Sequence, residues 1–134
     1  MKSTLRSIGA VIAGSITIGI ISFIADLIIG KLSPDIFSLS GRSAHPALLA
    51  FMAAYSVAFA AVGGYVTAAL APRAPMKHVI ALAVLELIGG AGAAYQAGDM
   101  LPMWFSAVVV ILPIPAILLA GTVKSRTSEP SHAQ

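Results

Sequence analysis

Four long apolar segments limit what this sequence can fold into. They cover about residues 8–29, 46–70, 79–97 and 103–123 of the 134-residue chain. Each is close to the ~20 apolar residues that a helix needs to cross about 30 Å of hydrocarbon at about 1.5 Å per residue. Runs of this length without alternating polarity are typical of helices, which satisfy their own backbone polar groups in lipid. The segments therefore predict four transmembrane helices.

Composition supports the same interpretation. Hydrophobic residues make up 58% of the chain and charged residues only 10%, which is far from the usage of soluble domains. We expect an all-α, integral membrane bundle of four transmembrane helices, forming one domain over residues 1–124. The polar residues 125–134 predict a disordered tail. The protein should be a multi-pass protein of a cell membrane, with the lipid bilayer as its first partner.

The basic side chains predict the orientation of the helices. Six of the eight fall on one side of the four-helix layout, and these are Lys2, Arg6, Arg73, Lys77, Lys124 and Arg126. Lys31 and Arg42 fall on the other side. Because cytoplasmic loops carry an excess of Lys and Arg, both termini and the middle loop should be cytoplasmic. The net charge of +3 then reflects orientation and attraction to anionic lipid, and we expect no nucleic-acid partner.

Small residues at helical spacing predict which helix faces pack together. Helices in a bilayer associate by close backbone approach and by interhelical hydrogen bonds, which small and hydroxyl residues permit. Ser15, Gly19, Ser22 and Asp26 form one such stripe on the first helix. The residues expected at helix contacts are Gly19, Ala60, Gly63, Gly89, Gly90, Pro113 and Pro115. The two prolines also remove backbone donors and should bend the last helix.

Two carboxylates within the apolar segments are the main candidate sites. Counted from the cytoplasmic helix ends, Glu86 lies roughly 10 Å deep, level with Ser15, and Asp26 lies roughly 27 Å deep. A separation of roughly 15 Å along the membrane normal excludes a shared-proton pair or a common metal site. The two residues therefore belong to separate sites. For Asp26 we expect a structural role near the outer surface, within reach of water or of basic side chains.

Glu86 has two interpretations. In the first, it is a protonated acid that donates a hydrogen bond to a carbonyl freed by Pro113 or Pro115, and so fixes the bundle geometry. In the second, it titrates and carries protons, because charged residues inside a membrane usually face a cavity or a partner. Polar steps from Glu86 toward Asp26 would then be Ser15, Ser22 and Ser56. The pattern favours the first interpretation.

Catalytic and metal-binding chemistry find little support in the sequence. The chain has no cysteine, so disulfides and thiolate sites are excluded. Ser56 has no evident base, and a metal site would require His45, Asp26 and Asp99 to converge, which their spacing does not specify. We expect no enzyme activity, no metal and no cofactor.

Two stretches carry a resemblance to known proteins. They are "GGYVTAALAPRAPMKHVIALAVL", from Gly63 to Leu85, and "MLPMWFSAVVVILPIPAILLAG". Together they resemble a widespread group of small bacterial four-helix membrane proteins of unassigned function. The resemblance implies a location in the bacterial inner membrane, and no catalytic residue can be carried over from it. Small multidrug resistance transporters are similar in size and helix count. They depend on an acidic residue in the first helix, whereas the central carboxylate here is Glu86 in the third.

The sequence leaves two functional hypotheses from different classes. The first is a non-catalytic subunit that packs with itself, as a homo-oligomer, or with a larger membrane protein through its small-residue faces. The second is a small proton-coupled transporter or channel subunit that uses Glu86 as its titrating carboxylate. The first explains more of the small residues and is preferred.

Overall fold

The computed structural model describes residues 2–32, 46–98 and 102–128. Its helices are α1 (Lys2–Leu32), α3 (Pro46–Leu70), α4 (Pro75–Ala97), α5 (Met103–Ile111) and α6 (Pro113–Ser128). The described part of the chain contains no strand, which confirms the all-helical prediction. It contains four helical spans that are long and apolar enough to cross a membrane, the fourth made of α5 and α6 together.

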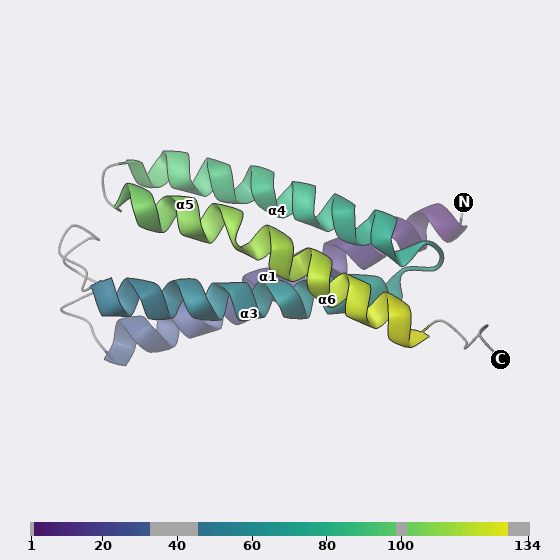
Figure 1. Cartoon of the computed structure of the whole chain (residues 1–134), viewed down its shortest axis with the longest axis horizontal. Coiled ribbons are helices and arrows are strands. Elements are labelled where there is room, and N and C mark those ends of the chain that lie inside the picture. The colour runs from purple at the N-terminus through teal and green to yellow at the C-terminus, as the bar shows by residue number, and fades with distance from the viewer. Residues whose placement is uncertain (1, 33–45, 99–101, 129–134) are drawn as a thin grey trace.

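The helices form an elongated bundle in which the most extensive contacts are those of α3 with α6 and with α1. The beginning of α1, the turn between α3 and α4, and the end of α6 all lie at one end of the bundle (Figure 1), which we call the terminal end. Both α1 and α4 begin there and run in the same direction. Their far ends lie apart, α1 beside α3 and α4 beside α5 (Figure 1).

The interior is built mostly from small side chains, and the surface from large apolar ones. One core cluster consists of Ala60, Ala68, Val79, Leu82, Ala83 and Ile117, and a second of Leu49, Ala53 and Phe105. On the outside, Phe23, Ile88 and Leu119 are 63%, 65% and 67% exposed. A soluble protein rarely shows such an extensive apolar surface. The distribution suits helices that lipid surrounds and that approach one another closely inside.

Glycines set the closest helix contacts. A Cβ atom at Gly63 would lie 3.0 Å from the carbonyl oxygen of Gly14, so the α1 and α3 backbones meet there. A Cβ atom at Gly64 would lie 2.5 Å from the carbonyl oxygen of Ile117, where α3 meets α6. Among the residues expected at contacts, Ala60 and Gly63 are buried, and Gly90 lies within van der Waals distance of Val110.

Three of the expected contact residues lie elsewhere. Gly19 and Gly89 are exposed, and nothing lies within 4 Å of the position that a Cβ atom would take at either. Pro115 is exposed whereas Pro113 is half-buried, because residues two positions apart lie on different faces of a helix. Within the single chain these three residues are exposed, so their expected role at helix contacts stays a prediction.

The helix ends also differ from the apolar segments. α1 begins at Lys2, and α6 continues to Ser128, so residues 125–128 are helical where the sequence predicted a disordered tail. Composition marks only where the apolar stretch ends, whereas backbone hydrogen bonds can continue the helix into polar residues. The bend expected from the prolines is present as a break at Leu112, between α5 and α6.

Candidate functional site

Glu86 is held by a hydrogen bond between α1 and α4. The hydroxyl of Ser15 donates to Glu86 Oε1 over 2.8 Å, and both side chains are half-buried. The sequence placed these two residues at the same depth, but it did not pair them. We call the line of contact between α1 and α4 that contains this hydrogen bond the α1–α4 seam.

The neighbours of Ser15 explain why its hydroxyl reaches Glu86. A Cβ atom at Gly14 would lie 3.2 Å from the Leu82 side chain and 2.8 Å from the Gly63 carbonyl oxygen, so α1, α3 and α4 all converge at Gly14. Close by, the buried Thr67 hydroxyl donates to the Ala10 carbonyl oxygen over 3.1 Å and ties α3 to α1. This junction fixes α1 against its neighbours and directs the next residue, Ser15, along α4.

The expected partner of Glu86 was wrong. Glu86 faces α1 and bonds to Ser15, whereas Gly90, one turn further along α4, faces Val110 of α5. Carbonyls freed by Pro113 and Pro115 belong to α5, so they lie beside a different part of α4. In the observed bond the Glu86 carboxyl group accepts from the Ser15 hydroxyl.

Asp26 forms the second polar pair. The Tyr55 hydroxyl of α3 donates a hydrogen bond to Asp26 Oδ1 of α1. The Tyr55 ring packs between Phe51 and Phe59, with ring centroids 5.6 Å and 5.2 Å away. Three aromatic residues at spacings of four lie along one face of α3, and the two outer rings hold the phenol in place.

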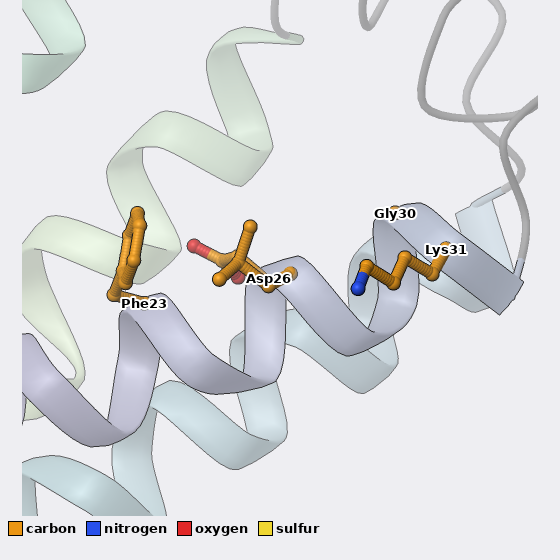
Figure 2. A pocket seen from close by; sticks show the side chains of 5 residues that line it. Phe23, Asp26, Gly30 and Lys31 are labelled. Carbon is orange, nitrogen blue, oxygen red and sulfur yellow. The ribbon is translucent and has the colours of Figure 1, made fainter.

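Two hollows meet at Asp26. A cavity of about 220 Å³ lies between α1, α3 and α5 and is lined by Ser22, Asp26, Met52, Tyr55, Ser56, Phe105 and Val109. A hollow of about 430 Å³ on the side of α1 is lined by Phe23, Asp26, Leu27, Gly30 and Lys31. Figure 2 shows the Lys31 side chain extending along α1 in the direction of Asp26. Asp26 therefore borders both the cavity inside the bundle and the hollow on the side of α1.

The structure divides the predicted site residues into two groups. Ser22 and Ser56 join Asp26 around the cavity, and Ser15 joins Glu86. Ser15 and Asp26 are separated by eleven positions on α1, which corresponds to about 16 Å along the helix. Neither Ser15 nor Glu86 lines the cavity at Asp26. The carboxylates lie in separate places, as their depths predicted.

Tyr55 is the functional candidate that sequence reasoning missed. The sequence contained a signal for Tyr55, because a tyrosine hydroxyl inside an apolar helix needs a hydrogen-bond partner. Tyr55 lies fifteen positions from the terminal end of α3, about 22 Å along that helix, which approaches the depth counted for Asp26.

The part of the chain that the structure describes contains no cluster of side chains that could bind a metal ion. No three His, Cys, Asp or Glu side chains converge there in a way that could hold an ion. His45 and Asp99, which the outer metal hypothesis requires, lie outside the described residues, as does Arg42. Ser56 donates to the Ala53 carbonyl oxygen over 3.1 Å and has an internal structural partner.

No known protein family, curated protein or solved structure matches this chain. The resemblance to small bacterial membrane proteins therefore stays a prediction. The structure itself defines the class: an all-helical protein whose four spans are compatible with a multi-pass membrane bundle.

Proposed function

We propose that the protein is a non-catalytic membrane subunit that associates with a second copy or with a larger membrane protein. The contact surface is the uncovered part of its α1–α4 seam, which we define as the stretch around Gly19 and Gly89 where the two helices separate. In this proposal both termini are cytoplasmic, in the inner membrane of a bacterium. The terminal end of the bundle then faces the cytoplasm, and the uncovered part of the seam lies in the outer half of the membrane.

One observation carries the proposal. Ser15 and Glu86 hold α1 and α4 together, but in the next turn of each helix away from the terminal end one glycine has no neighbour at its Cβ position. Gly19 on α1 and Gly89 on α4 are exposed, with nothing within 4 Å of a Cβ position at either. Both helices thus continue with small residues beyond the point where they separate.

Small residues at this place favour another helix over lipid alone. Inside the bundle, glycine lies where backbones meet, as at Gly14 with Gly63 and at Gly64 with Ile117. In a bilayer such close approach is a main source of helix association. Gly92 and Ala93 are also exposed near Gly89 on α4, so a partner helix would meet small residues there.

The proposal is tested by the oligomeric state of paired variants. In Gly19→Leu and Gly89→Leu, a bulky side chain would hold a partner helix away, so association should fall while the isolated bundle keeps its stability. Ala91→Leu is the matched control, because Ala91 is exposed on the same helix and, two positions after Gly89, lies on a different face of it. Cross-linking in native membranes and light scattering of detergent-solubilised protein measure the association.

The outcomes separate the partners as well. Loss of a homo-oligomer in both glycine variants supports self-association, and loss of a cross-linked larger species supports a different membrane protein. If the two glycine variants and the Ala91→Leu control form the same complexes as the unchanged protein, the assembly role is refuted.

A further inference from the structure

The inner end of the α1–α4 seam contains a groove that the assembly role does not use. It has a volume of about 470 Å³ and is lined by Ser7, Ile8, Val11 and Ile12 of α1 and by Lys77, His78 and Ala81 of α4. From this groove we propose that the protein binds an anionic phospholipid, with the phosphate beside Lys77 and His78 and an acyl chain between the two helices.

The basic side chains lie at one end of the groove. Lys77 and His78 belong to the first turn of α4, which begins at Pro75. His78 Nδ1 lies 3.2 Å from the Ala74 carbonyl oxygen, so this contact orients the imidazole ring from within the turn. Lys77 is exposed and can move its ammonium group toward a phosphate.

Apart from Ser7 and the two basic residues, the side chains that line the groove are apolar. Ile8 and Ile12 are 51% and 47% exposed, and Ala81 leaves open space on the α4 side. From Lys77 to Glu86, where Ser15 closes the seam, α4 rises by about 13 Å. The groove therefore offers a charged mouth at the helix end and an apolar wall that continues toward the Ser15–Glu86 bond.

This arrangement fits an occupant that is charged at one end and apolar along its length. A free phosphate would use the mouth and leave the apolar wall uncovered. A second protein helix would need small residues for close approach, whereas α1 offers branched Ile8, Val11 and Ile12 here. Basic pockets between membrane helices on the cytoplasmic side are known sites for anionic lipid headgroups. Charge and shape together select the lipid.

The inference rests on the proposed membrane orientation but not on the assembly role. It is tested by native mass spectrometry of the full chain in detergent, with phosphatidylglycerol and phosphatidylcholine supplied in equal amounts. The unchanged protein should retain phosphatidylglycerol preferentially. Lys77→Gln should weaken this binding about fivefold, as expected for the loss of one interfacial cation. Arg73→Gln is the matched control, because Arg73 is exposed nearby but does not line the groove.

A second variant separates the groove from general surface charge. Ala81→Phe keeps every charge and fills the apolar wall, so it should also lower phosphatidylglycerol retention. The inference is overturned if Lys77→Gln and Arg73→Gln weaken binding equally, if Ala81→Phe leaves binding unchanged, or if inorganic phosphate displaces the lipid at comparable concentration. Oligomeric state is measured in the same spectra, so failure of lipid binding and failure of assembly are distinguished.

Discussion

The crossing of α3 and α6 at Gly64 gives the sharpest test of the packing. In Gly64→Ala, the new Cβ atom would lie 2.5 Å from the carbonyl oxygen and 2.9 Å from the Cα atom of Ile117. Both are backbone atoms, so no side-chain rotation can relieve the contact and one helix must shift. Overpacking of this kind costs about 1–3 kcal/mol, against about 1 kcal/mol gained from the higher helix propensity of alanine. We expect a net loss of up to about 2 kcal/mol.

The loss can be measured by denaturant-dependent unfolding in detergent, followed by circular dichroism. Gly9→Ala is the matched control, because nothing lies within 4 Å of its Cβ position and alanine should stabilise α1 slightly. Gly121→Ala should fall between the two, since its Cβ would meet the Val79 methyl groups at 2.5 Å and would meet no backbone atom this closely, although the buried, β-branched Val79 can yield only a little. If Gly64→Ala is as stable as Gly9→Ala, α3 and α6 do not cross as closely as described.

Two further predictions concern orientation and Glu86. Reporter fusions after Arg73 and at the C-terminus should report the cytoplasm and one after Arg42 the outside; equal populations of both orientations would revive a dual-topology transporter. Glu86→Gln should keep the fold nearly intact, because an amide oxygen still accepts from Ser15, while Glu86→Leu should lose about 1–2 kcal/mol. A folded glutamine variant that loses a pH-dependent ion flux in vesicles would instead establish the proton-carrier alternative, since glutamine cannot titrate.

The helices could be predicted from the sequence because each apolar segment is long enough to be unambiguous. The predicted segment 46–70 coincides with α3, Pro46–Leu70. The break at Leu112 was also predictable, because proline removes a donor whatever the surroundings. Helix ends that lie in polar sequence, such as Lys2 and Ser128, were less predictable, because composition does not show where backbone hydrogen bonding stops.

Helix rotation was harder to predict than helix position. Ser15, Gly19, Ser22 and Asp26 form one stripe in the sequence, yet Gly19 is exposed while the other three are half-buried. Ser15 bonds to α4 and Ser22 and Asp26 line the cavity shared with α3 and α5, whereas nothing lies within 4 Å of the Cβ position at Gly19 between them. A stripe of small residues predicts which face of a helix packs. How much of that face is covered depends on the angle and position at which two helices cross, and sequence spacing does not give either.

The polar pairs show a similar limit. Depth counting brought Glu86 level with Ser15 and separated it from Asp26, and the structure has both features. The count did not choose the donor for either carboxylate. Ser15 and Tyr55 became partners through rotation about their helix axes, a variable that a one-dimensional count leaves out.

Glu86 lies at the point of the α1–α4 seam where the residues on either side differ in size and in contacts. On the terminal side, branched side chains such as Val11 line a groove; on the far side, Gly19 and Gly89 have no neighbour. Apolar contacts surrounded by lipid distinguish weakly between one register and the next, because lipid replaces them at little cost. A hydrogen bond between Ser15 and Glu86 is different, since a shift of one residue leaves a polar group facing hydrocarbon. One polar pair can therefore set both how far α1 and α4 stay together and where they begin to separate.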